Sequence, residues 1–289
     1  MQTKHLTIKY KNIPLYLSIY EFAIDKPSII FIHGITFHAG VYTSLIPGVN
    51  FLKSLAEKGF NVIALDLQGH GKSGGVRGLF TYNDLIGNIS RVVDYVFQNY
   101  NQKIGIFGSS LGGILSFYAA VSEPRIQAVV CHNVLDLKNI HSSLPYFGYR
   151  RFLLPLSKAF PTFLRSLSWL SIPLTFFINP NQIFEDPENI KRWQKDPLCI
   201  WNYRASSWIS LFLTPNDKPT IEEMKKPIRI IVGEKDPFLP FESVKTFYER
   251  LQCKKDLVII PKAGHMLPLE HLSTTVSLVT EWFNTALMD

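Results

Sequence analysis

The stretch IGIFGSSLGG, residues 104–113, decides how the rest of the chain is interpreted. Its first four residues form an apolar run typical of a strand buried in a sheet, and an apolar helical pattern begins at Gly113. Between them stands a G-x-S-x-G motif with Ser110 at its centre. A strand, this motif and a helix in succession predict a sharp, strained turn that lifts the central hydroxyl out of the sheet.

Such a turn requires small residues on both sides, because the strand and the helix approach each other closely there. Gly108 and Gly112 meet this requirement. The N–H groups at the start of the following helix favour negative charge beside the Ser110 hydroxyl. We therefore interpret Ser110 as a candidate nucleophile. Ser109 is its rival, but Ser109 lacks the flanking glycines, and we interpret it as a packing or pocket-lining residue.

A serine hydroxyl becomes a good nucleophile only when a base removes its proton, and that base is usually a histidine oriented by a carboxylate. Asp236 and His265 each follow an apolar stretch that is predicted to be a buried strand. Both would then lie in loops at the carboxyl edge of the sheet, where proteins with a parallel sheet and flanking helices bind ligands. Along the chain the order is Ser110, Asp236, His265, and nucleophile, acid and histidine are known to act together in this order. Glu234 remains an alternative acid, although it lies nearer to its strand.

Attack on a carbonyl group creates a negative oxygen, which needs hydrogen-bond donors. One predicted donor is the N–H of Leu111, the residue after Ser110. The second is predicted in a loop that reads HGIT, residues 33–36, where the glycine lets the backbone bend. We assign the N–H of Ile35 to this role. The competing interpretation of the His-Gly pair is an ordinary tight turn.

Strands and helices alternate along most of the chain. The strand patterns are found at residues 5–10, 15–22, 28–32, 60–66, 103–108, 128–134, 228–233 and 257–260. Helical patterns are found at residues 51–58, 81–96, 110–121, 242–251 and 272–286, the second with Thr81 as its N-terminal cap. This alternation predicts a mostly parallel central sheet flanked by helices on both faces.

The pattern breaks between residues 136 and 219, which are rich in proline and aromatic side chains and show no clear strand. Four of the five tryptophans fall there, which indicates a unit with an apolar surface of its own: Trp169, Trp193, Trp201 and Trp208. We therefore predict a core made of residues 1–135 and 220–289, with residues 136–219 inserted as a helical cap.

The composition limits the classes of function. Hydrophobic residues make up 46% of the chain and charged residues 18%, so the chain can bury a large core. The formal net charge of +7 is mild, and no basic run is interleaved with aromatic residues, so we expect no nucleic-acid partner.

The cysteines and the apolar segments bear on location. Cys131, Cys199 and Cys253 are far apart and lack metal-binding spacing, so we expect reduced thiols, no bound metal and a cytoplasmic location. The N-terminal residues lack the apolar segment of a signal peptide. The most apolar stretch, residues 152–178, is interrupted by charges and prolines, which argues against a membrane-spanning helix.

Residues 66–74 read DLQGHGKSG. Together with the His-Gly pair, the motif around Ser110, and Asp236 and His265, this string resembles the monoacylglycerol-lipase and lysophospholipase branch of the α/β hydrolases. The resemblance covers about residues 29–134 and 228–283. It implies an α/β-hydrolase fold, the same three catalytic residues, and neither a metal nor an organic cofactor. We expect His70 to be part of a turn without a chemical role, and Ser109 stands where this family often has histidine.

The resemblance ends at the predicted cap, so the substrate is inferred from the residues there. Apolar side chains gather in this segment and could line an acyl-chain pocket, dip into a lipid surface or form the core of the cap: Leu153, Leu154, Phe160, Phe163, Leu164, Leu167, Trp169, Leu170, Phe176 and Phe177. We expect a serine hydrolase that cleaves a lipophilic carboxylic ester, such as a monoacylglycerol or lysophospholipid, with peripheral membrane contact through the cap as an additional hypothesis.

Two kinds of alternative remain open at this point. The same residues could hydrolyse a thioester, an amide or a carbon–carbon bond. The fold could also serve a non-catalytic protein that binds a small ligand. The sequence leaves the oligomeric state open.

Overall fold

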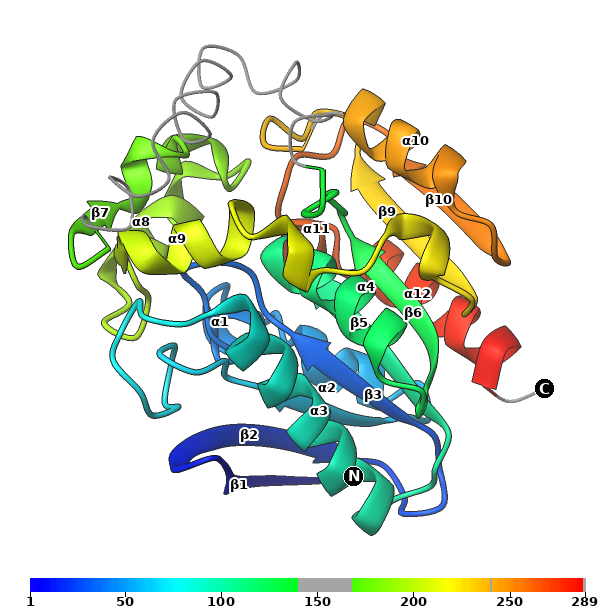
Figure 1. Ribbon diagram of the computed structural model, residues 1–289. Helices are drawn as coiled ribbons and strands as arrows, with labels where there is room; N and C mark the ends of the chain where they lie inside the picture. Colours follow the sequence, from blue (N-terminus) through cyan, green and yellow to red (C-terminus); the bar gives the residue numbers. More distant parts are fainter. Residues whose placement is uncertain (140–167, 240, 288–289) are drawn as a thin grey trace.

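A central sheet of eight strands organises the protein. The computed structural model describes residues 1–139, 168–239 and 241–287. In the sheet the strand order is β1-β2-β4-β3-β5-β6-β9-β10 (Figure 1). Its strands are β1 (Gln2–Tyr10), β2 (Ile13–Glu21), β3 (Ser28–Ile32), β4 (Asn61–Leu65), β5 (Ile104–Ser109), β6 (Ile126–His132), β9 (Ile228–Gly233) and β10 (Lys255–Ile260).

Most neighbouring strands in this sheet are parallel. Strands β1 and β2 form an antiparallel hairpin, and β2 pairs antiparallel with β4. From β4 to β10 every neighbouring pair is parallel. Parallel neighbours require crossover connections, which the helices supply. The prediction of a mostly parallel sheet is therefore confirmed.

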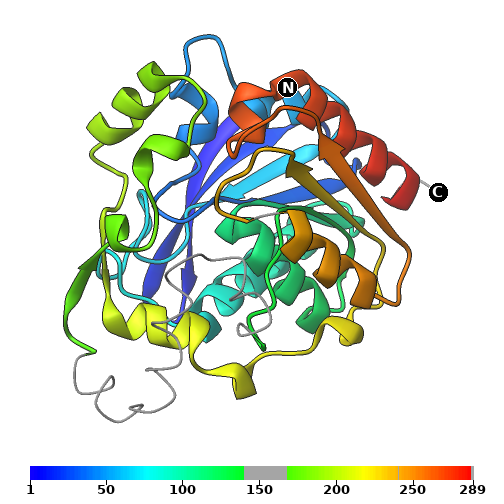
Figure 2. The ribbon, with the colours of Figure 1, turned by 90° about the horizontal axis from the view of Figure 1, so that it is seen from above.

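Helices cover both faces of the sheet, as the view from above shows (Figure 2). On one face α3 packs against α4, and α10 joins them through an edge-to-face contact between Phe117 and Phe247 with ring centroids 4.9 Å apart. On the other face α2 packs against α12. The helices are α1 (Val41–Ser44), α2 (Phe51–Ala56), α3 (Tyr82–Asn99), α4 (Leu111–Ser122), α8 (Pro187–Lys195), α9 (Ala205–Phe212), α10 (Phe241–Arg250), α11 (Leu267–Glu270) and α12 (Leu272–Leu287).

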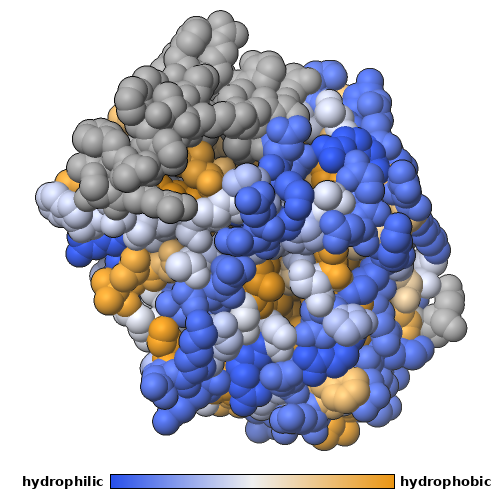
Figure 3. Space-filling model, viewed as in Figure 1, coloured by the Kyte–Doolittle hydropathy of each residue, from blue (hydrophilic) through white to orange (hydrophobic). Residues whose placement is uncertain are grey.

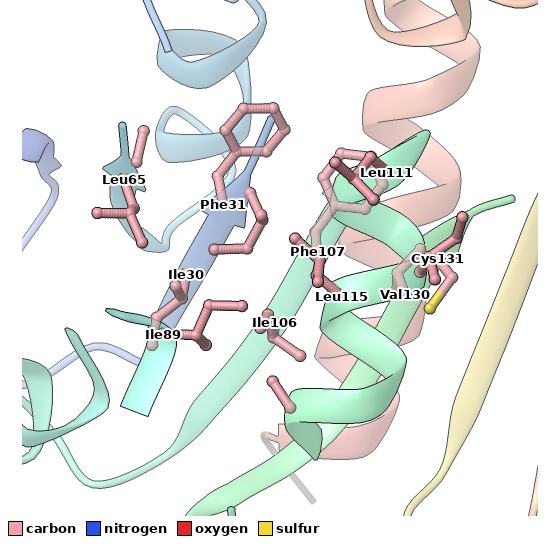
Figure 4. Packing of buried hydrophobic residues seen from close by; sticks show 14 of the residues in the cluster. Ile30, Phe31, Leu65, Ile89, Ile106, Phe107, Leu111, Leu115, Val130 and Cys131 are labelled. Carbon is pink, nitrogen blue, oxygen red and sulfur yellow. The ribbon is translucent and has the colours of Figure 1, made fainter. Parts of the chain in front are cut away.

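The core is built on the central strands, whose side chains alternate between the two faces. Ile30 of β3 pairs with Ile106 of β5, and both lie near Ile89 of α3 (Figure 4). Phe31 and Phe107 pair in the same register and point to the opposite face, with ring centroids 5.7 Å apart. All five side chains are buried. Burial on both faces explains why these strands are continuous apolar runs in the sequence.

The carboxyl ends of the parallel strands meet at one edge of the sheet. Strand β3 ends at Ile32, β5 at Ser109, β9 at Gly233 and β10 at Ile260. Each predicted site residue follows one of these strand ends. The fold therefore brings four loops that are far apart in the sequence to the edge where ligands bind in α/β proteins.

Of the predicted cap, residues 136–139 and 168–219 are described, and the second of these segments is the larger. It contains helices α8 and α9 and two short antiparallel strands, β7 (Ser171–Pro173) and β8 (Asn202–Arg204). Our expectation that this segment has no strand was wrong, because strands of three residues carry no alternating pattern. The segment packs on the core: the N–H of Phe80 donates to Ser207 of α9 at 3.0 Å. The division into core and cap remains a prediction.

This segment carries exposed aromatic residues on its surface. Trp169 and Phe176 are 66% and 54% exposed, and hydrophobic surface adjoins the grey atoms in Figure 3. Six of the predicted apolar cap residues lie outside the described residues: Leu153, Leu154, Phe160, Phe163, Leu164 and Leu167. Within the described ranges, no helix combines the length and the apolar character needed to cross a bilayer.

The start of α3 offers a test of how local sequence determines this fold. As predicted, Thr81 caps the helix, its Oγ1 accepting the N–H of Asp84 at 3.1 Å. Thr81→Ala should lower the free energy of unfolding by about 1 kcal/mol, because this N–H loses its partner. Urea denaturation measures the change. The control is Thr285→Ala on the exposed side of α12, and equal losses in both variants would contradict the capping role.

Candidate active site

Ser110 occupies a strained turn between β5 and α4. Its backbone angles are φ 58° and ψ −119°, a conformation that L-residues rarely adopt. A Cβ atom on Gly108 would lie 2.0 Å from the carbonyl oxygen of Gly112, and one on Gly112 would lie 2.1 Å from that of Ile32. Only glycine fits at these positions, which lets α4 begin directly at the strand end. The N–H of Ser110 donates to the carbonyl of His132 at 2.9 Å and holds the turn.

The structure brings the three predicted catalytic side chains together. Nε2 of His265 lies 3.0 Å from Oγ of Ser110, and Nδ1 of the same ring lies 2.7 Å from Oδ2 of Asp236. His265 and Asp236 are buried, whereas Ser110 is partly exposed. A substrate can therefore reach the hydroxyl, while the imidazole and the carboxylate are shielded from water.

Four hydrogen bonds fix the Asp236 carboxylate. Oδ2 accepts from His265 and also from Nδ2 of Asn133 at 2.7 Å. Oδ1 accepts the N–H groups of Phe238 at 2.8 Å and Leu239 at 3.3 Å. The carboxylate thus has one orientation, in which it faces the histidine.

The charge of Asp236 follows from the same contacts. Burial acts to raise the pKa of Asp236, but the attraction of His265 and the hydrogen bond between them outweigh burial and hold that pKa well below its usual range. The carboxylate is ionised at neutral pH, so Nδ1 of His265 carries the proton of their hydrogen bond. Nε2 then presents a lone pair to the Ser110 hydroxyl.

The alternatives weighed from the sequence occupy other environments. Glu234 is exposed, and its carboxylate accepts the N–H of Lys262 at 2.7 Å instead of facing His265. Ser109 is fully buried, and its hydroxyl lies 2.9 Å from Nδ1 of His132. A buried hydroxyl of this kind packs behind the site and does not face a substrate.

Two residues of this network, His132 and Asn133, were not found by sequence analysis. His132 lies behind His265, with ring centroids 5.3 Å apart, and Asn133 links it to Asp236. Asn133 adopts φ 69°, a conformation that asparagine tolerates better than most residues. The available signal was an adjacent His-Asn pair at the end of a predicted buried strand, where two polar side chains need partners.

The two predicted oxyanion donors belong to backbone segments that adjoin Ser110. Leu111 is the first residue of α4, so its N–H has no partner within the helix. Gly34 lies against the serine, since a Cβ atom on it would be 3.3 Å from Cβ of Ser110. Among the described residues, neither the N–H of Leu111 nor that of Ile35 donates a hydrogen bond.

A buried histidine sets the direction of the Ile35 N–H. Nε2 of His33 accepts the N–H of Leu67 at 3.0 Å, so the ring proton is on Nδ1, which donates to the carbonyl of Gly34 at 2.8 Å. A trans peptide points its C=O and N–H in opposite directions. The N–H of Ile35, in the same peptide as that carbonyl, therefore points away from His33.

Two groups of metal-binding residue types occur among the described residues, and hydrogen bonds explain both. One group is His132, Asp236 and His265, whose contacts are given above. The other is His38, Asp196 and Cys199. Nδ1 of His38 accepts the N–H of Gly40, so Nε2 carries a proton toward Asp196, 3.0 Å away. In both groups the carboxylate is already hydrogen-bonded to a histidine of the same group.

An open pocket of about 370 Å³ lies beside β7 and β8. It is lined by Arg77, Ser171, Cys199, Ile200, Trp201, Asn202 and Arg204. Ser110 is not among the lining residues, so we give this pocket no part in the chemistry. The acyl-chain pocket expected under the cap remains a prediction.

The mostly parallel sheet, with a strained serine turn at the carboxyl end of a central strand, defines an α/β hydrolase. The chain belongs to the family described as serine aminopeptidase, S33, whose model matches residues 24–271. The predicted α/β-hydrolase fold class is therefore confirmed.

Similarity to curated proteins covers part of the chain. An uncharacterized 31.7 kDa protein of the traX-finO intergenic region of Escherichia coli is 32% identical over 123 residues, which are 42% of this chain and 41% of that protein. The chain thus matches about two fifths of the length of this curated relative.

Solved structures extend the similarity over nearly the whole chain. The monoacylglycerol lipase of Paleococcus ferrophilus has a TM-score of 0.74 at 24% identity, covering 94% of this chain and 99% of that one. A soluble variant of monoglyceride lipase from Saccharomyces cerevisiae, bound to a substrate analogue, has a TM-score of 0.77 at 14% identity, covering 99% and 96%. At these identities the similarity shows the shared fold.

Buried histidines at this edge should make the folded protein sensitive to acid. Burial lowers the pKa of His70 to about 4 and that of His132 to about 3, and it holds the pKa of His33 well below its usual value. In the unfolded chain these side chains take up protons below about pH 6.5. From about pH 6.5 to 4 the unfolded state therefore binds more protons, and the free energy of unfolding should fall by about 1.4 kcal/mol per pH unit for each histidine.

Urea denaturation at pH 7 and pH 5 measures this dependence. The matched variant is His70→Gln, which removes one titrating group and should show a shallower slope than the unaltered protein. Equal stability at the two pH values would show that these histidines are not held neutral by the fold.

Proposed function

We propose that this protein is a carboxylic ester hydrolase with Ser110 as nucleophile, His265 as general base and Asp236 as the group that orients the histidine. The observation that carries this proposal is the position of His265, with Nε2 3.0 Å from Ser110 Oγ and Nδ1 2.7 Å from Asp236 Oδ2. Both distances lie within the range needed for proton transfer and for orientation of the ring.

The proposed reaction has two steps. Nε2 of His265 takes the proton of Ser110 while Oγ attacks the ester carbonyl carbon, and the N–H groups of Ile35 and Leu111 donate to the oxyanion. The protonated His265, paired with Asp236, then gives its proton to the leaving alcohol, and an acyl-enzyme remains. A water molecule deprotonated by His265 attacks the acyl group, and the proton returns to Ser110 Oγ as the carboxylic acid leaves.

We propose a lipophilic ester of the monoacylglycerol or lysophospholipid type as the substrate. Two proteins that share this fold are named monoacylglycerol lipase and monoglyceride lipase. The segment predicted as a cap is rich in aromatic rings: the Trp208 ring centroid lies 4.4 Å from that of Phe177 and 5.9 Å from that of Phe212. Apolar side chains of this kind are suited to lining an acyl-chain pocket.

Two further expectations belong to this proposal. The exposed Trp169 and Phe176, together with the net charge of +7, support peripheral contact of the cap with an anionic lipid surface. The three cysteines are free thiols, which supports a reducing cytoplasmic location.

A fluorophosphonate probe tests the proposed nucleophile, because it reacts covalently with an activated serine. We expect labelling of the unaltered protein and its loss in Ser110→Ala, together with a fall in kcat of about 10⁴-fold or more. Ser109→Ala is the matched control, since it removes the neighbouring hydroxyl, and it should keep the label. Labelling that persists in Ser110→Ala and disappears in Ser109→Ala would reverse the assignment, and no labelling of the unaltered protein would favour a ligand-binding role.

A substrate panel tests the proposed class of ester. We expect kcat/KM to rise with acyl length from acetyl to long-chain glycerol esters, since each buried methylene group contributes about 0.8 kcal/mol. The panel includes a matched thioester, an amide and an aminoacyl anilide, the last because the family description names an aminopeptidase. Activity confined to acetyl or aminoacyl substrates would refute the lipophilic-ester proposal.

A further inference from the structure

We propose that Tyr203, on β8 of the predicted cap, is a positioning residue that holds the oxyanion loop in its working shape through Thr36. This inference rests on the proposed function, since it concerns the donor Ile35. It assigns the inserted segment a part in catalysis beyond covering the substrate.

Thr36 has a conformation that its side chain disfavours. It is fully buried and adopts φ 70°, in the left-handed region. A β-branched residue is strained there, and such a residue persists only where surrounding contacts impose the conformation. Thr36 directly follows Ile35, so the contacts that hold it also constrain the backbone of the predicted donor.

All three polar groups of Thr36 are bound by the inserted segment. Its N–H donates to the hydroxyl of Tyr203 at 2.8 Å. Its carbonyl accepts the N–H of Ile200 at 3.0 Å. Its Oγ1 accepts Nε1–H of Trp193 at 3.0 Å. We call these three contacts the Thr36 clasp.

Two hydrogen bonds fix the orientation of the Tyr203 hydroxyl. Nδ1 of His70 lies 3.0 Å from the carbonyl of Gln68, so it must carry the ring proton and donate. Burial lowers the pKa of His70 to about 4, so the ring is neutral at neutral pH and Nε2 is an acceptor. The hydroxyl, 3.1 Å away, donates to it. Tyr203 therefore accepts from Thr36 and donates to His70, and the two contacts fix its orientation.

The clasp and His33 hold the two peptide planes on either side of Ile35. His33 binds the carbonyl of Gly34, which directs the Ile35 N–H away from His33. Tyr203 binds the N–H of Thr36, which fixes the next peptide. Without the Tyr203 hydroxyl, that peptide can rotate and relieve the strain at Thr36. His33 would still bind the Gly34 carbonyl, but the released backbone after Ile35 would let the Ile35 N–H shift relative to Ser110.

The test compares Tyr203→Phe with Tyr118→Phe. Tyr118 is the matched control because it is also a fully buried tyrosine whose hydroxyl accepts a backbone N–H, that of Leu137 at 2.7 Å, in another part of the fold. We expect Tyr203→Phe to lower kcat about 10- to 100-fold with KM changed by less than about 3-fold, a part of the loss seen when an oxyanion donor is removed. Tyr118→Phe should leave both constants unchanged.

A second pair of variants separates positioning from a general loss of structure. Glycine adopts φ 70° without strain. In the Thr36→Gly background, Tyr203→Phe should therefore lower kcat by less than about 3-fold. If Tyr203→Phe does not fold, Trp193→Phe removes another contact of the clasp and is judged by the same loss of kcat at constant KM.

Hydrogen exchange supplies a readout independent of turnover. The Thr36 amide should exchange faster in Tyr203→Phe than in Tyr118→Phe, whether or not the protein hydrolyses esters. A folded Tyr203→Phe protein with unchanged kcat, or with unchanged exchange at Thr36, would overturn the proposal. Loss of the proposed function would show differently, as an unaltered protein without Ser110-dependent turnover, and the exchange experiment would still decide whether the clasp holds the loop.

Discussion

Helix α4 can begin directly on the end of β5 only because three backbone positions carry no side chain. A Cβ atom on Gly108, Gly112 or Gly113 would lie between 2.0 and 2.5 Å from a neighbouring carbonyl oxygen. This close crossing forces Ser110 to φ 58° and raises its hydroxyl above the sheet edge. It also places the N–H of Leu111, at the start of α4, next to that serine. His265 binds the Ser110 hydroxyl at this point, and Asp236 binds His265 in turn.

Behind this point the protein buries three histidine side chains. His33, His70 and His132 are all fully shielded, and each is bound to backbone or side-chain groups. A buried polar group is tolerated when its hydrogen bonds are made, and it then permits one arrangement of its neighbours. These hydrogen-bonded rings therefore hold the neighbouring loops in one position relative to each other. They orient peptide planes at the same edge where the proposed chemistry requires fixed donors.

Local patterns in the sequence predicted the sheet well. The strands at 28–32 and 228–233 have the predicted bounds, because continuous apolar runs between turns leave little ambiguity. The convergence of Ser110, Asp236 and His265 was also predictable, since residues after parallel strands share one edge. The sequence favoured Asp236 over Glu234 because Glu234 lies nearer to its strand. In the structure it is Asp236 that binds His265, while Glu234 accepts the N–H of Lys262.

Other features depend on contacts between distant parts of the chain, which no local pattern reveals. The bond between Thr36 and Tyr203 joins residues 167 positions apart. His70 was expected to be part of a turn only, yet its ring fixes the hydroxyl of that tyrosine. The strands β7 and β8 stabilise each other across a long gap and are too short to show periodicity.

The Thr36 clasp also bears on how such an enzyme could diversify. Only two of its three contacts come from side chains, those of Tyr203 and Trp193, because the third comes from the main chain at Ile200. Within the described part of the predicted cap, the clasp therefore depends on the identity of only these two aromatic side chains. Substrate preference and catalytic rate would then evolve as separate traits. A cap transplanted from a related protein would support catalysis only if it again bound the polar groups of Thr36.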